Sequence, residues 1–255
     1  MARERYLVGA GEDTIHTGVI ELKTAGEKRR NWWHYHKVHV LVAAALLGIA
    51  ASFVYTVVTR EHPDYTIGML TSYKLPEEVL EAMEDRIAQY ADDRNGDGEV
   101  LVRLDNYVMG GANSAADYQA VQAAYTRFAG DAAMNTAMIF VHDAEAFETM
   151  QSSLGGFFQY TDGSPMPEEA QDFENAMRPW SDFKALEDFT AEGSDGLNGW
   201  TPEIVAELCG RLRISVRTAE GSGFAENEKD MAYYHDSMEL LDRLYQGEPA
   251  EAPAR

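Results

Sequence analysis

The stretch Tyr65–Tyr107, "YTIGMLTSYKLPEEVLEAMEDRIAQYADDRNGDGEVLVRLDNY", decides the fold class. Residues 65–71 form a short apolar run with the character of a strand, and residues 75–91 carry apolar side chains at helical spacing. Pro76 suits the first turn of that helix. Residues 99–109 alternate between apolar and polar side chains, which is typical of a second strand. A strand–helix–strand order with short connections predicts two parallel strands joined by a crossover helix.

The same alternation continues toward the C-terminus. The sequence predicts an α/β fold with a mostly parallel sheet, helices on both faces, and the second and third strands flanking the first. Sheets of this kind bind ligands beyond the C-terminal ends of their strands. The further predicted elements are helices over 113–130, 144–155, 201–211 and 228–247, strands over 136–143 and 212–218, and a less regular middle over 157–200.

Ahead of the sheet, residues 40–58 form an uncharged run of 19 residues. A helix of that length covers roughly 28 Å, close to the bilayer core of about 30 Å. Basic residues precede the run, which predicts a cytoplasmic N-terminus. A cleaved signal peptide is the alternative, but nearly forty residues precede the apolar run. The predicted parts are a cytoplasmic segment over 1–37, a transmembrane anchor over 38–59, an extracytoplasmic α/β domain over 60–246 and a disordered tail over 247–255.

The charge of the chain is unevenly distributed. Residues 1–59 hold seven Lys/Arg and five Asp/Glu, a net of +2, whereas residues 60–255 hold 14 basic and 38 acidic residues, a net of −24. So acidic a domain repels phosphates, which argues against nucleic-acid binding. The single cysteine, Cys209, excludes an intrachain disulfide and a zinc cluster built on cysteines.

The segment "DRNGDGEV" resembles the start of a calcium-binding loop. Asp93, Asn95 and Asp97 occupy the first, third and fifth positions of the EF-hand pattern, and Glu99 offers its carbonyl at the seventh. Leu104 stands at the twelfth position, where a bidentate Glu is expected. A polar turn is the alternative, because Asn-Gly and Asp-Gly pairs favour turns. The loop precedes the second strand, so a calcium ion there is expected to be structural and not catalytic.

Five residues lie at or just after the C-terminal ends of the predicted strands, where a ligand is expected. We predict a small-solute site at this edge, and the alternative is that these side chains have structural roles only. No common hydrolase, P-loop or metalloprotease motif is present, so we expect binding and not catalysis. The candidate ligand-binding residues are Ser72, Tyr73, Asn106, Tyr107 and His142.

The segment "NWWHYHKVHVLVAAALLG" and the strand–helix–"DRNGDGEV"–strand unit after it resemble a group of uncharacterised membrane-anchored proteins of Gram-positive bacteria. The likeness covers roughly residues 30–110. The strand–helix–strand part is also similar to the opening of one lobe of a type 2 extracytoplasmic solute-binding protein. The resemblance implies an anchored extracytoplasmic binding domain. The alternative function is an interaction or scaffold subunit of a membrane complex, whose acidic face meets a cationic partner.

Overall fold

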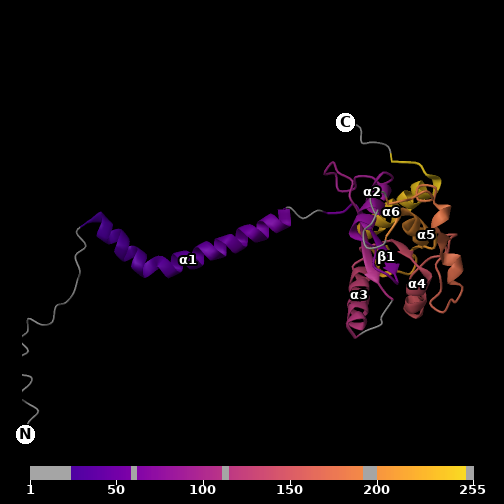
Figure 1. Cartoon of the computed structure of the whole chain (residues 1–255), viewed down its shortest axis with the longest axis horizontal. Helices are drawn as coiled ribbons and strands as arrows, with labels where there is room; N and C mark the ends of the chain where they lie inside the picture. The colour runs from indigo at the N-terminus through magenta and orange to yellow at the C-terminus, as the bar shows by residue number, and fades with distance from the viewer. Residues whose placement is uncertain (1–23, 59–61, 111–114, 192–199, 251–255) are drawn as a thin grey trace, which may run out of the picture. The chain divides into compact units, whose positions relative to one another are not determined.

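The computed structural model describes residues 24–58, 62–110, 115–191 and 200–250. The chain divides into two compact units, Met1–Glu61 and His62–Arg255. The described part of the first unit is helix α1 (Ala25–Val58), drawn in indigo in Figure 1. It begins earlier than the predicted anchor. The predictions for residues 1–23, for Thr59 and for the tail beyond residue 250 lie outside the described residues.

Helix α1 is long and apolar enough over Ala25–Thr56 to cross a membrane, judged by length and composition, and none of its most apolar window is buried within the chain. Signal sequences and core helices of soluble proteins have similar length and composition.

The described part of the second unit contains a five-stranded sheet in the order β2-β1-β3-β5-β4. Strand β1 pairs in parallel with β2 and β3, whereas β5 runs antiparallel to β3 and to β4. The sheet is therefore mixed. The strands are β1 (Tyr65–Thr71), β2 (Val102–Val108), β3 (Ile139–His142), β4 (Arg178–Pro179) and β5 (Arg213–Val216). The helices of this unit are α2 (Glu77–Ala88), α3 (Ala115–Ala133), α4 (Ala144–Met150), α5 (Pro202–Gly210) and α6 (Glu228–Gln246).

The predicted placement of the second and third strands on either side of the first is confirmed. The direction of strand β5 differs from the prediction of a mostly parallel sheet. After α4 the chain does not make a single crossover; it passes through short 3-10 turns and β4 before α5 leads into β5. This long, irregular connection brings the chain to the sheet from the opposite end, so β5 runs antiparallel to β3.

The side chains of β1 alternate between two hydrophobic clusters. Ile67 and Met69 belong to one cluster, together with side chains of α2, α5 and α6. Leu70 belongs to the other, together with side chains of α3 and α4. A Cβ at Gly68 would lie 2.5 Å from the ring of Phe140, so a glycine is needed there for the ring to pack on β1. Each large side chain fully buried in these clusters stabilises the fold by about 1.5–3 kcal/mol.

Candidate functional site

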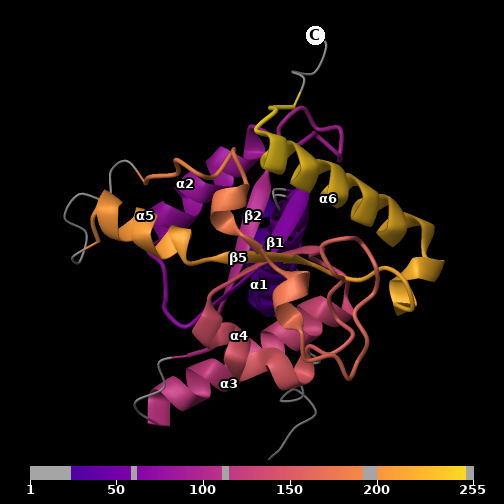
Figure 2. The same cartoon turned by 90° about the vertical axis from the view of Figure 1, so that its right-hand side faces the viewer.

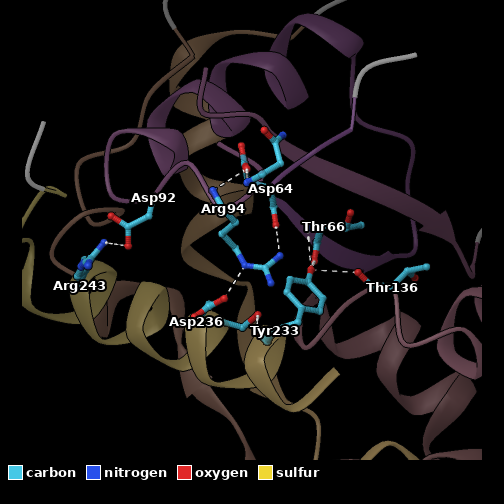
Figure 3. Close-up of polar contacts among 10 residues, drawn as sticks. Asp64, Thr66, Asp92, Arg94, Thr136, Tyr233, Asp236 and Arg243 are labelled. Atoms are coloured by element: carbon cyan, nitrogen blue, oxygen red, sulfur yellow. Dashed lines mark hydrogen bonds and ion pairs between the residues drawn. The ribbon is translucent and has the colours of Figure 1, made fainter. Parts of the chain in front are cut away.

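The loop between α2 and β2 is held by one buried carboxylate, that of Asp64, which is 2% exposed. Its Oδ1 accepts from the backbone N–H groups of Arg94 (2.8 Å) and Asn95 (3.0 Å), and its Oδ2 accepts from that of Leu101 (2.9 Å). Figure 3 shows this carboxylate beside the loop. The loop is thereby fixed at two points to the residue that precedes β1.

The oxygens predicted to bind calcium accept hydrogen bonds from amides within the loop. Asp93 accepts from the N–H groups of Gly96 (2.6 Å) and Gly98 (2.8 Å). Asn95 Oδ1 accepts from the N–H of Asp97 at 2.8 Å, and Asp97 Oδ1 accepts from that of Glu99 at 2.9 Å. Among the described residues, no group of three or more His, Cys, Asp or Glu side chains is placed to hold a metal ion. Calcium binding at this loop stays a prediction.

Arg94 joins the same loop to α6 (Figure 3). Its Nε donates to Asp236 Oδ2 at 2.6 Å, and its guanidinium carbon lies 4.6 Å from the ring centroid of Tyr233. A second ion pair, Arg243 to Asp92 at 2.7 Å, joins the helix to the start of the loop. This end of the sheet, where β1 and β2 begin, is closely packed, which agrees with a structural role for the loop.

At the opposite end of the sheet, where β1 and β3 end, Ser72 is hydrogen-bonded to Asp143. The backbone N–H and the hydroxyl of Ser72 donate to Asp143 Oδ2 at 2.6 and 2.9 Å, and Asp143 Oδ1 accepts from the N–H of Ala146 at 2.7 Å. A Cβ on Gly110 would lie 2.7 Å from Ser72 Cβ. The space where β1 and β3 end is therefore occupied by protein groups, at the place where a ligand was predicted.

Tyr107 and His142 are buried, with exposed fractions of 1% and 0%. The Tyr107 hydroxyl donates to Asp131 Oδ2 at 2.8 Å, while His142 Nε2 lies 2.9 Å from Ser215 Oγ. Burial, aided by the positive charge of Arg213, lowers the pKa of His142 from 6.5 to about 3, so its ring is neutral. Neither side chain reaches solvent, and neither is offered to a ligand in this structure.

Asn106 and Tyr73 lie near a surface cavity of about 650 Å³, which Asn106 lines together with Lys74, Arg127 and Trp200. The rings of Tyr73 and Trp200 lie 6.4 Å apart. The Asn106 Nδ2 atom is buried without a hydrogen-bond partner. Asn106 and Tyr107 are successive strand residues, so they point to opposite faces of the sheet. The five predicted ligand residues therefore do not form one site.

A smaller cavity of about 360 Å³ lies beside the edge of β5, and we call it the edge cavity. Strand β4 pairs with only Arg213 and Ile214 of β5, and the next contact at this edge is the Gln159 N–H donating to Val216 O at 2.9 Å. The cavity occupies the space between these contacts and α6. Its apolar lining includes Phe183, Ile214, Val216, Met238 and Leu241, and its charged lining is Asp162, Arg178 and Asp242.

The charged groups of the edge cavity are not paired with one another. Arg178 Nη2 donates to the carbonyl of Thr161 at 2.9 Å, and the guanidinium carbon lies 5.2 Å from the ring centroid of Tyr245. Within the described part of the chain, neither Arg178 nor Asp242 forms an ion pair. Hydrogen bonds from Ser164 lower the pKa of Asp162, which keeps that carboxylate ionised.

The prediction from sequence missed the edge cavity, because four separate segments of the chain build it. The one local signal is on α6, where Met238, Leu241 and Tyr245 follow each other at helical spacing. No family model, curated protein or solved structure that was compared with the chain matches it. The function must therefore be inferred from the geometry of the chain itself.

Proposed function

We propose that this chain is a single-pass, membrane-anchored binding protein whose extracytoplasmic α/β domain captures a small solute in the edge cavity, without catalysis. The observation that carries this proposal is the edge cavity itself. It combines a buried apolar floor with charged groups that have no ion-pair partner. Small-molecule sites are typically concave, mostly apolar and equipped with a few polar groups that orient the ligand.

The anchoring part of the proposal rests on α1. Its apolar stretch is exposed along its length, and a lipid environment removes that surface from water. Lys28, Arg29, Arg30 and Lys37 precede the stretch, which favours a cytoplasmic N-terminus and an outer C-terminal domain.

The domain part of the proposal is a layered α/β unit with helices on both faces of the sheet. Two separate hydrophobic clusters support it: one joins β1 to α2, α5 and α6, and the other joins β1 to α3 and α4. Figure 2 is consistent with this arrangement, since α2 and α6 are drawn toward the top of the view and α5 to the left of the strands, whereas α3 and α4 are drawn below them. The β2-β1-β3 half has the parallel pairing expected of a solute-binding lobe.

The proposal is tested by filling the edge cavity. The full-length chain in detergent micelles is screened by thermal shift against small solutes, and hits are repeated with Leu241→Trp, which places a large ring in the cavity. Ala232→Trp, at an exposed position on the same helix, is the matched control. We expect stabilisation of the parent and of Ala232→Trp but not of Leu241→Trp. Hits that stabilise all three alike, or a screen without any hit, would overturn the proposal.

A scaffold role is the second candidate, and the exposed face of α3 favours it. Tyr118 and Tyr125 on this helix are 63% and 39% exposed, and Met134 just beyond it is 72% exposed. Exposed large apolar side chains gathered on one element often mark a protein contact. Crosslinking in the native membrane is the discriminating measurement. A single stoichiometric partner linked through Tyr118 or Tyr125 favours the scaffold role, and its absence favours solute capture.

We also propose that the 93–99 loop binds a structural calcium ion. The support is its spacing of side-chain oxygens, together with its position in a corner where ordering the loop stabilises the fold. Asp93, Asn95 and Asp97 would supply side-chain oxygens, and Glu99 a backbone carbonyl. To bind the ion, Asp93 must exchange at least one of its amide contacts for the metal.

A further inference from the structure

We infer that the edge cavity selects a small zwitterion with an apolar body, that is, a solute with one carboxylate, one ammonium group and an apolar group. An apolar amino acid has this chemistry. The inference rests on the proposed function, because it names the ligand of the same cavity. Three features of the lining carry it: an arginine without a counter-ion, two carboxylates that stand apart from it, and the apolar floor.

Arg178 is the receptor for the carboxylate. The side chain is half-buried, and its guanidinium makes one hydrogen bond, to Thr161 O at 2.9 Å, while it stacks over the ring of Tyr245. A guanidinium has five N–H donors in a planar fork that matches a carboxylate. Partial burial of a charge without a counter-ion is unfavourable, and an anionic ligand group relieves it. The stacking also fixes the plane of the fork, which reduces the entropy lost on binding.

Asp242 and Asp162 are the receptors for the ammonium group. Asp242 lies one helical turn from Tyr245, the ring under Arg178, and Asp162 directly follows Thr161, the residue to which Arg178 is bound. Both residues line the same cavity as Arg178, and neither carboxylate comes within 4.0 Å of the guanidinium nitrogens. A bound ammonium group can occupy the intervening space next to the carboxylates while the ligand's own carboxylate contacts Arg178.

The overall charge distinguishes a zwitterion from a simple anion. Residues 60–255 carry 14 basic and 38 acidic residues, so the net charge of −24 repels an anionic solute as it approaches. A zwitterion has no net charge and avoids this repulsion. A simple cation is attracted by the same field, but it would leave Arg178 without a counter-ion.

The apolar floor takes the third part of the ligand. Phe183 and Ile214 are 0% and 3% exposed, and Met238 and Leu241 on α6 add further apolar side chains to the lining. A cavity of about 360 Å³ lies at the small end of the range for small-molecule sites, roughly 300–1,000 Å³. A ligand of the size of phenylalanine is therefore a suitable probe.

The test uses the full-length chain in detergent micelles and three matched probes, measured by isothermal titration calorimetry. L-Phenylalanine has both charges, phenethylamine lacks the carboxylate, and 3-phenylpropionate lacks the ammonium group. We expect L-phenylalanine to bind at least about tenfold more tightly than either truncated probe, since one charged contact contributes about 1.4 kcal/mol or more to binding. Equal affinity for L-phenylalanine and phenethylamine, or for L-phenylalanine and 3-phenylpropionate, would overturn the inference.

Two variants assign the charges. Arg178→Gln is expected to weaken L-phenylalanine at least tenfold and to leave phenethylamine unchanged, whereas Asp242→Asn is expected to weaken L-phenylalanine and leave 3-phenylpropionate unchanged. Arg178→Lys keeps the charge without the fork and should restore part of the affinity. Lys229→Gln, at the far end of α6, is the control for a general change in charge. Unchanged affinity in both Arg178→Gln and Asp242→Asn, with folded variants by circular dichroism, contradicts the inference.

The two proposals fail in different ways. If none of the three probes binds but another solute stabilises the parent and not Leu241→Trp, the cavity is a binding site and the zwitterion inference is wrong. If no solute distinguishes the parent from Leu241→Trp, the proposed function itself is wrong.

Discussion

Asp64 and Arg94 are joined twice: the Asp64 carboxylate accepts from the Arg94 backbone N–H at 2.8 Å, and the Arg94 guanidinium donates to the Asp64 backbone carbonyl at 3.0 Å. Figure 3 shows both contacts. Asp64 immediately precedes β1, and Arg94 lies in the loop that precedes β2. The pair therefore ties the loop to the start of β1, and the Leu101 N–H, directly before β2, donates to the same Asp64 carboxylate, so this one residue joins the starts of two adjacent parallel strands.

Asp64→Ala is expected to be strongly destabilising. The substitution leaves three backbone N–H groups in the loop without their acceptor, and each such loss costs about 1 kcal/mol, so the free energy of unfolding should fall by about 3 kcal/mol. Urea denaturation measures the change. Asp97→Ala, which removes one exposed hydrogen bond, is the matched control and should cost well below half as much. Equal losses of stability in the two variants would contradict the inference that the Asp64 carboxylate holds the loop in place.

Arg94 and Asp236 are expected to contribute unequally to stability. The Asp236 side chain is 41% exposed, so Asp236→Ala should cost about 0.5 kcal/mol. Arg94→Ala should cost about 2 kcal/mol, because the guanidinium also bonds to Asp64 O and stacks over Tyr233. Only the ion pair should weaken in high salt. A double-mutant cycle at low and high salt checks both statements, and equal single-variant losses would show that the stacking is unimportant.

The β2-β1-β3 half of the sheet is predictable from sequence, because right-handed crossovers whose two helices cover opposite faces place the second and third strands on either side of the first. The direction of β5 is not. It depends on an irregular segment whose aromatic side chains, such as Phe158, Phe173 and Phe183, pack through long-range contacts. No local periodicity records where such a segment returns the chain to the sheet.

His142 should make the stability of the domain depend on pH. Its pKa is about 3 in the folded chain and 6.5 in the unfolded chain, so between these values only the unfolded state takes up the proton. Stability is therefore retained above pH 6.5 and lost as the pH falls below it, by about 2 kcal/mol between pH 7 and pH 5. Urea midpoints across this range, measured for the parent and for His142→Gln, report the contribution.

His142→Gln should flatten this part of the pH profile, because glutamine does not titrate and can still bond to Ser215 Oγ. His235→Gln, on an exposed position of α6, provides the matched control and should leave the slope of the parent intact. A parent profile that is already flat between pH 5 and pH 7 would show that His142 takes up its proton as readily in the folded as in the unfolded state, in conflict with its burial.

The ligand residues are harder to predict than the strands. Position along the chain placed Ser72 just after β1, but it put His142 after a strand of which it is the last residue. It could not show that Ser72 is bound by Asp143 or that His142 is buried. The edge cavity involves Arg178 and Asp242, which are distant in sequence and carry no motif. The two residues meet only in the folded chain, where both line this cavity and Arg178 stacks over Tyr245 of α6.

Calcium is expected to raise the melting temperature of the chain, with weak affinity. Leu104 stands where a bidentate Glu is expected, so the dissociation constant should be about 10⁻⁴–10⁻³ M, the range of extracellular modules. Binding to the folded state alone stabilises it by about 1.4 kcal/mol at ten times that concentration. Melting curves in EDTA and in millimolar calcium measure the shift.

Asp93→Ala should abolish that shift and should also lower the melting temperature in EDTA, because Asp93 accepts from two loop amides without any metal. Asp162→Ala, an aspartate of another turn, is the control and should keep the calcium response. Identical parent curves in EDTA and calcium would leave the loop as a hydrogen-bonded polar turn.

The membrane topology can be determined by maleimide labelling of introduced cysteines, because the native thiol of Cys209 does not react. Cys209 is 3% exposed, and burial raises its pKa to about 12, so at pH 7 it offers almost no thiolate to a maleimide. Glu169→Cys and Thr24→Cys each place a thiol at an exposed position, one in the second unit and one directly before α1 in the first. A membrane-impermeant maleimide should label Glu169→Cys in intact cells, and Thr24→Cys only after lysis, because the basic flank before the apolar stretch favours the cytoplasm. Labelling of both in intact cells would show that Thr24 is not cytoplasmic, and recovery of Glu169→Cys in the medium without α1 would show that α1 acts as a signal sequence and not as an anchor.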